Sequence, residues 1–313
     1  IVAGLVVLAY RILLEYAGKG LNQVLALAQK YPFITGVWFV VLILLAGIVG
    51  YLVRFEPLIS GSGIPQVEGE MAGKINQPWW KVLPAKFAGG FLCLFGGLSL
   101  GREGPSIQIG AMSGKAVSQV LGRGRTEERY LITCGASAGL SAAFHAPLAG
   151  VMFSLEEIHK NFSVSVLISV MTASITADYI SAEFMGFRPV FQFTVSGAIP
   201  SEYYGHIIAL GIILGLLGAF YNKVTLKSQE LFGKIKGNRC EMVRLLIPFL
   251  LAGVLGMMMP EILGSGHNII DMVTEGNMML KGILLLFVMK LLFSSISFGS
   301  GAPGGIFFPL LVL

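Results

Sequence analysis

The chain has 313 residues, of which 55% are apolar and only 12% are charged, and its formal net charge is +5. A typical soluble domain carries about 25% charged residues, because a soluble surface needs charges to stay solvated. With a mean hydropathy of +0.78, the composition argues against a soluble globular protein, a disordered chain, a coiled coil and a disulfide scaffold, and it predicts a polytopic membrane protein.

The positive net charge does not indicate nucleic acid as a partner, because no basic patch is interleaved with aromatic residues on a soluble face. The three cysteines share no metal-ligand spacing and the four histidines form no HExxH pattern, so we expect neither a metal nor a cofactor. Glycine makes up 41 of the 313 residues, well above the usual share of about 7%. In an apolar chain, glycine lets helices approach closely or break inside the bilayer.

The apolar stretches, in chain order, fall at about 1–14, 34–53, 83–101, 104–121, 130–155, 163–186, 205–222, 243–260, 280–298 and 304–313. A helix that spans the bilayer needs about 20 residues. Several stretches are shorter than that and many are cut by Gly or Pro, which predicts broken and re-entrant helices of the kind found at transporter binding sites. Because Ile1 and Leu313 both lie inside apolar runs, we expect the chain to be part of a longer membrane domain with material missing at both ends. The first run is therefore not interpreted as a signal peptide.

Three pentads have the glycine and proline of a backbone turn that opens a helix: Gly61–Pro65, Gly101–Pro105 and Gly305–Pro309. Proline suits the first helical turn, and the preceding glycine lets the backbone come close to a ligand. Helix N-termini expose unpaired N–H groups and a partial positive charge. Three such ends that converge near the bilayer midplane would bind an anion weakly enough to release it. Loops that merely join helices are the structural alternative.

Positive charge gathers in two clusters, which the positive-inside rule puts on the cytoplasmic side. They are Arg123, Arg125 and Arg129, and Lys223, Lys227, Lys234, Lys236, Arg239 and Arg244. The 28 residues Tyr130–Glu157 are long for one span. A hairpin of two half-length helices that turns near His145–Pro147 fits better, and it returns Glu156 and Glu157 to the cytoplasmic side. A single tilted span is the alternative.

The chain also contains a faint internal repeat. Gly61–Gly63, Lys86 and the pentad at Gly101 recur as Gly264–Gly266, Lys290 and the pentad at Gly305. The lysine precedes the pentad by 15 residues in both copies. The Gly-Ser-Gly segment precedes the pentad by 40 residues in the first copy and by 41 in the second. This pattern predicts one repeat over residues 1–195 and a second, incomplete repeat over 196–313, with a site between their interruptions.

These motifs together resemble the CLC family of chloride channels and chloride/proton exchangers. The three pentads match the family's three signatures in order, and Ala146–Gly150, followed by Phe153 and Glu156-Glu157, resembles the segment after the second signature. The resemblance implies an all-helical (all-α) membrane protein with two inverted-topology repeats. It also implies a homodimer in the lipid bilayer with one pore per subunit, chloride and protons as the transported ions, and the bacterial inner membrane as the location.

The resemblance also implies roles for single residues. Glu103 matches the gating glutamate, which occupies the place of the anion until it is protonated; a helix-start carboxylate that only offsets the dipole is the alternative. The implied anion ligands are Ser62, Arg102, Gly104, Ile306 and Phe307, with the backbone N–H of Arg102 more important than its side chain. Serine at position 62 resembles chloride-type members, whereas nitrate-favouring relatives carry proline there and fluoride-type exchangers carry methionine. The family's tyrosine ligand, from a later helix, would lie beyond Leu313.

Glu157 separates an exchanger from a channel. Its position resembles that of the inner proton-transfer glutamate of the exchangers, where channels tend to carry a nonionisable residue. A solvated Glu156-Glu157 pair beside Lys160 is the alternative. We therefore predict a chloride/proton antiporter and not an enzyme, with a passive gated chloride channel of the same fold as the main alternative.

Two short motifs suggest other classes. The pattern Gly-x-Ser-x-Gly occurs at Gly135–Gly139 near His145, and it would mark a hydrolase only in a strand-turn-helix context. An intramembrane serine hydrolase is therefore the remote alternative, and close helix packing is the favoured reading. The segment Gly110–Lys115 resembles a phosphate-binding loop but is one residue short of the required spacing.

Overall fold

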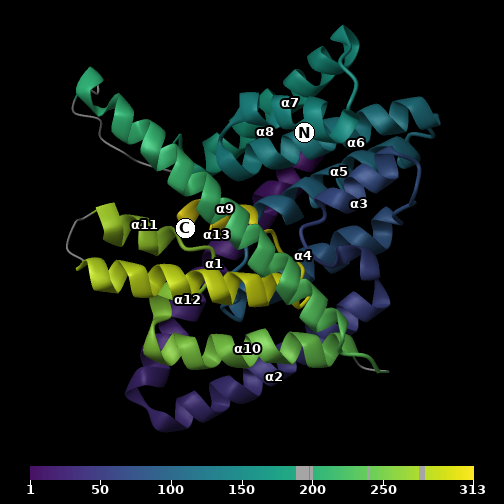
Figure 1. Cartoon of the computed structure of the whole chain (residues 1–313). Helices are drawn as coiled ribbons and strands as arrows, with labels where there is room; N and C mark the ends of the chain where they lie inside the picture. The colour runs from purple at the N-terminus through teal and green to yellow at the C-terminus, as the bar shows by residue number, and fades with distance from the viewer. Residues whose placement is uncertain (188–196, 198–199, 238–239, 275–278) are drawn as a thin grey trace.

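The computed structural model describes residues 1–187, 197, 200–237, 240–274 and 279–313 (Figure 1). The described residues form helices and no strands. The helices are α1 (Val2–Lys30), α2 (Pro32–Phe55), α3 (Ile64–Met71), α4 (Trp79–Phe95), α5 (Glu103–Val120), α6 (Arg125–Phe144), α7 (Pro147–Phe153), α8 (Val164–Met185), α9 (Tyr204–Gly233), α10 (Cys240–Met258), α11 (His267–Thr274), α12 (Leu280–Gly299) and α13 (Phe307–Val312). A π-helical turn, Ser154–His159, continues α7.

Within the described ranges, five helices are long and apolar enough to cross a membrane: α2, α8, α9, α10 and α12. Four others, α3, α7, α11 and α13, have only six to eight residues, too few to span a bilayer. The predicted all-α polytopic membrane fold with broken helices is therefore confirmed.

The core is built on two helix pairs whose glycines let backbones touch. A Cβ on Gly135 of α6 would lie 2.2 Å from the carbonyl oxygen of Gly110 in α5. The pair α2 and α10 is antiparallel, and the two helices lie side by side at the bottom of Figure 1. A Cβ on Gly50 would lie 2.7 Å from Met242 Cα, whereas one on Gly253 would meet Phe39 at 2.8 Å. Close contacts at both ends of the pair therefore hold α2 and α10 in this antiparallel arrangement.

The basic clusters give these helices a sidedness. Arg129 donates to the carbonyl of Met71, which ends α3, and Arg244 donates to the carbonyl of Ile235 at 2.7 Å. By the positive-inside rule, the start of α10, the end of α2 and the end of α3 therefore face the cytoplasm. The loop after α10, which leads into α11, lies at the opposite, outer end.

The predicted turn at His145 is confirmed. His145 adopts a left-handed conformation (φ 53°) at the end of α6, and α7 begins at Pro147. One detail differs, because α6 has 20 residues and is not half-length. It begins at Arg125, before the apolar stretch, because the charged first turn lies at the cytoplasmic surface and continues the same helix.

Candidate functional site

The loops that open α5 and α13 meet head to head. The N–H of Gly101 donates to the carbonyl of Gly305 at 2.7 Å, and the N–H of Gly305 returns the bond to Gly101 at 2.7 Å. The third loop joins them, because the N–H of Gly304 donates to the carbonyl of Gly61 at 3.0 Å. The three glycine-proline pentads, more than 200 residues apart at the extremes, thus converge on one point.

Glu103 lies at this point and is only 3% exposed. Its carboxylate accepts hydrogen bonds from its own backbone N–H and from that of Phe308 in α13. The second oxygen, Oε2, is buried and has no hydrogen-bond partner among the described residues. It lies against the Cα of Gly101, where an added Cβ would approach it to 2.2 Å. The carboxylate therefore occupies amide donors at the starts of two helices, the place where an anion would bind.

Ser62 lies on the cytoplasmic side of this carboxylate, in the loop before α3. Its Oγ accepts the N–H of Ile64, the first residue of α3, at 3.3 Å, although the N-cap position itself is held by Gly63. This bond uses a lone pair, and the hydroxyl hydrogen stays available for another acceptor. Ser62 also touches the start of α5, because a Cβ on Gly104 would lie 2.7 Å from the Ser62 carbonyl oxygen.

The other two expected ligands, Ile306 and Phe307, are at the start of α13. The ring of Phe307 is about half exposed and packs edge-on against Phe144, the last residue of α6, with centroids 5.7 Å apart. The structure therefore brings the α6–α7 turn against the start of α13.

Two buried lysines hold the glycine loops in place, and each repeats the other's contacts. Lys86 donates to the carbonyls of Ile59 and Gly61 at 2.8 and 2.6 Å. Lys290 donates to the carbonyls of Ile262 and Gly264, both at 2.8 Å. Sequence reasoning used these lysines only to recognise the repeat and gave them no role, although a lysine in an apolar helix is itself a signal.

The two loops also share their backbone conformation. Gly61 and Gly63 have φ of 67° and 96°, and Gly264 and Gly266 have φ of 63° and 102°. Positive φ of this kind is accessible to glycine at little cost. One loop lies towards the cytoplasm and the other towards the outside, as inverted copies would.

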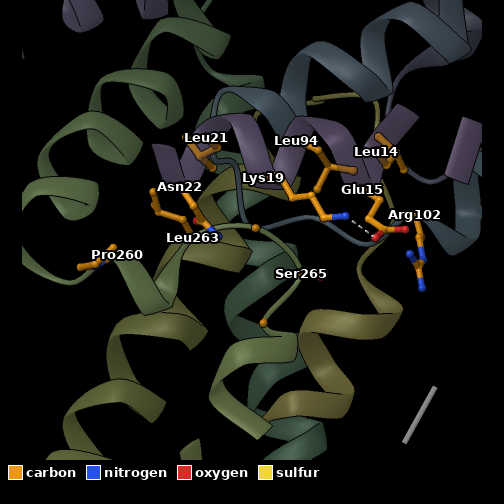
Figure 2. Close-up of a pocket in the computed structure, with 13 residues that line it drawn as sticks. Leu14, Glu15, Lys19, Leu21, Asn22, Leu94, Arg102, Pro260, Leu263 and Ser265 are labelled. Carbon is orange, nitrogen blue, oxygen red and sulfur yellow. Dashed lines mark hydrogen bonds and ion pairs between the residues drawn. The ribbon is translucent and has the colours of Figure 1, made fainter. Parts of the chain in front are cut away.

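A cavity of about 280 Å³ opens on the outer side, between α1 and the loop before α11 (Figure 2). Its wall carries Glu15 and Lys19, an ion pair at 2.9 Å, together with Arg102 and the Gly264–Gly266 loop. Within the described part of the chain, the Arg102 side chain makes no hydrogen bond or ion pair. The cavity thus places the positive charge of Arg102 directly outside Glu103, close enough to interact with its carboxylate.

The two glutamates that end the hairpin lie in the π-helical turn after α7. Glu156 is exposed and Glu157 is half-buried. A cytoplasmic-side cavity of about 370 Å³ adjoins the turn, lined by His159, Lys160 and Glu68 among others. Lys160 pairs with Glu68 at 3.3 Å rather than with either glutamate. Glu157 is not brought into contact with Glu103, so its role stays a prediction.

The motifs of the other classes lie in continuous helices. Ser137 is buried in the middle of α6, without the strand-turn-helix context that a nucleophile elbow requires. The favoured packing interpretation is confirmed by the contact of Gly135 with α5. Lys115 lies inside α5 and is bound to Glu70, Asn76 and the carbonyl of Gln77. The described residues contain no group of three or more His, Cys, Asp or Glu side chains that could hold a metal ion.

Comparison with known proteins agrees with this geometry. The family model described as voltage gated chloride channel matches residues 42–313. The chain is 37% identical over 297 residues to the H(+)/Cl(-) exchange transporter ClcA of Citrobacter koseri. The aligned region covers 92% of this chain and 63% of the relative. ClcA of Salmonella arizonae is 37% identical over 281 residues, 88% of the chain and 59% of the relative. The chain thus spans about three-fifths of the length of these curated relatives.

Two solved structures are also similar. A slow cyanobacterial Cl-/H+ antiporter superposes with a TM-score of 0.93 at 29% identity, over 100% of this chain and 74% of that one. A CLC-type fluoride/proton antiporter has a TM-score of 0.77 at 19% identity, over 99% and 77% of the two chains, which speaks for the fold alone.

Proposed function

The chain belongs to the voltage-gated chloride channel family, and from this we propose that the protein is a chloride/proton antiporter. The observation that carries the proposal is the buried Glu103 carboxylate, seated on backbone N–H groups that open α5 and α13. The relatives named as H(+)/Cl(-) exchange transporters favour exchange over a passive channel of the same fold.

In the proposed cycle, a proton taken up by Glu103 removes the charge that binds the carboxylate to these donors. The neutral side chain leaves the N–H groups of Glu103 and Phe308, and chloride enters the space between the two helix starts. The proposed ligands of the ion there are the N–H groups of Arg102, Gly104, Ile306 and Phe307. The hydroxyl of Ser62 binds the ion from the cytoplasmic side. Arg102 at the outer cavity draws anions towards the entrance, since fields focused in a cleft raise local anion concentration.

Glu157 is proposed to pass protons between the cytoplasm and Glu103. Its carboxylate is half-buried beside a cytoplasmic-side cavity, and carboxylates within membrane segments are candidates for carrying protons. We further propose that residues 1–195 and 196–313 are the two inverted repeats. The matching lysine contacts of Lys86 and Lys290 support this division. A homodimer in the bacterial inner membrane, with one pore per subunit, completes the proposal.

The test uses the full-length protein in liposomes, with an imposed chloride gradient, the voltage clamped near zero and the external pH recorded. The antiporter moves protons uphill. Glu157→Gln is expected to abolish proton movement while chloride still flows. Glu103→Gln is expected to remove coupling together with the part of the pH dependence that comes from Glu103 itself. Glu156→Gln, an exposed neighbour in the same turn, is the matched control and should behave as the unmutated protein.

Fast chloride flux without proton movement in the unmutated protein would make it a channel. Unchanged coupling in Glu103→Gln would remove the gate assignment.

A further inference from the structure

A second cluster of charged side chains lies beside the proposed gate, between α1, α6 and α8. Arg11 of α1 is 4% exposed, and its Nη1 donates to the carbonyl of Ala142 and, at 2.8 Å, to Ser181 Oγ. The same nitrogen lies 3.2 Å from His145 Nε2. On the other side of the ring, His145 Nδ1 lies 3.2 Å from Asp178 Oδ1.

The partners dictate the state of the imidazole. A guanidinium has only donors and a carboxylate has only acceptors. Nε2 faces the Nη1 donor and therefore carries the lone pair, sharing the two Nη1 hydrogens with Ala142 O and Ser181 Oγ. Nδ1 must then carry the proton that is donated to Asp178. His145 is neutral in this arrangement, with its tautomer determined from both sides.

This cluster holds the end of a helix. Ala142 offers one of the last carbonyls of α6, and a cation there satisfies an orphan acceptor and opposes the negative end of the dipole. His145 itself is the left-handed residue that turns the chain from α6 into α7. Its neighbour Phe144 packs on Phe307 at the start of α13. The cluster is thus one residue away from the proposed anion path.

We propose that Arg11, His145 and Asp178 form a clamp that positions Phe144 against Phe307, and that protonation of His145 releases this clamp. The inference rests on the proposed function, since it assigns positioning residues to the same transport path. When Nε2 takes a proton from water, an N–H replaces the lone pair and the imidazole gains a positive charge. Two donors of like charge then face each other at the Arg11 contact.

The geometry decides which side gives way. Arg11 is buried and keeps the carbonyl of Ala142, whereas the side chains of His145 and Asp178 are 10% and 22% exposed and can move towards water. Three charged groups face the imidazole: Arg11 from α1, Asp178 from α8, and Arg102 from the loop before α5. Two of the three are positive and oppose the protonated ring. Release of the turn therefore loosens Phe144 and, through it, the start of α13.

The test must separate this effect from titration of the gate, so the background is Glu103→Gln in the full-length protein. Chloride flux from liposomes is measured between about pH 5 and pH 8, the range in which histidine changes charge. Flux is expected to fall about tenfold as the pH is lowered, the size expected when a hydrogen bond to a charged group is lost. Adding His145→Asn should abolish this fall, because Asn tolerates the left-handed conformation and does not titrate.

The matched control is His206→Asn, which removes an exposed histidine at the outer start of α9 and should leave the fall intact. A flux that rises as the pH falls, or a fall that survives His145→Asn, would overturn the clamp.

A second readout does not depend on transport. In ¹⁵N spectra of histidine-labelled protein near neutral pH, the signal lost in His145→Asn is expected to be that of the neutral Nδ1–H form. An Nε2–H or a charged ring would refute the clamp. Absence of chloride flux in the unmutated protein would instead refute the proposed function. The ¹⁵N signal of His145 would then still test the clamp, because it does not depend on transport.

Discussion

Replacing Gly101 by alanine should unseat the Glu103 carboxylate without touching the carboxylate itself. The backbone of Gly101 does not have positive φ, so alanine is tolerated there and only the new methyl group matters. That methyl carbon would lie 2.2 Å from Glu103 Oε2 and 3.3 Å from Phe308 Cβ. The oxygen is the only one of these neighbours at the free end of a side chain, and so it is the group that moves.

The cost follows from the bond that is lost. Displacing the carboxylate breaks its hydrogen bond with the N–H of Phe308. A hydrogen bond to a charged group contributes about 1.5–3 kcal/mol. This corresponds to a shift of about 10- to 150-fold towards the displaced carboxylate. Chloride flux should rise, its pH dependence should weaken, and fewer protons should move per chloride, so that Gly101→Ala resembles Glu103→Gln.

The assay records chloride efflux and external pH from liposomes containing the full-length protein. Gly36→Ala is the matched control, because Gly36 lies in α2 with no atom within 4 Å of an added Cβ. Thermal unfolding of both variants checks that the fold is retained. A folded Gly101→Ala protein with unmutated coupling and pH dependence would refute the argument that this carboxylate sits on the Gly101 backbone.

Two further predictions concern the stability of the fold, and a third concerns the attraction of anions to the outer cavity. Lys290→Met should lower the unfolding temperature, because one buried and one partly buried carbonyl lose their donor, at about 1–3 kcal/mol for the buried one. Lys281→Met, at an exposed position, should not lower it. Equal unfolding temperatures would contradict the role of the buried lysine. Gly135→Ala should destabilise the protein in the same assay, because its methyl group would lie 2.2 Å from the carbonyl oxygen of Gly110, and an unchanged unfolding temperature would show that α5 and α6 are not in tight contact. Arg102→Gln should weaken external chloride binding most at low ionic strength and leave proton coupling intact, as measured by flux against external chloride; an effect independent of salt would argue against electrostatic attraction.

The sequence was informative wherever function depends on the backbone. Glycine and proline in the pentads at Gly101 and Gly305 predicted helix starts, and the structure has α5 and α13 beginning there. The turn at His145 was also predictable, because Pro147 cannot continue a helix and must open a new one. Local chemistry determines these features, so a local pattern reveals them.

Contacts between distant segments left no such pattern. Arg11 is 131 residues from Ala142 and 170 from Ser181, and nothing in the sequence around Arg11 marks it as a helix cap. The seat of Glu103 likewise depends on Phe308, a residue that sequence reasoning did not choose, and on the bare Cα of Gly101. The structure does not test the roles assigned to Ser62 and the other anion ligands, which stay predictions.

The bridge between Gly101 and Gly305 limits how such a protein can move. The start of α5 is joined to the start of α13 by two hydrogen bonds of 2.7 Å, at the very place where Glu103 lies. Helix starts joined in this way cannot move apart without breaking both bonds in the buried interior, where unpaired amides are costly. In the proposed exchange cycle, the ion path would therefore open and close through side-chain rotation against a stationary backbone. The amide protons of Gly101 and Gly305 should then be among the last to exchange with solvent, even while the protein is turning over.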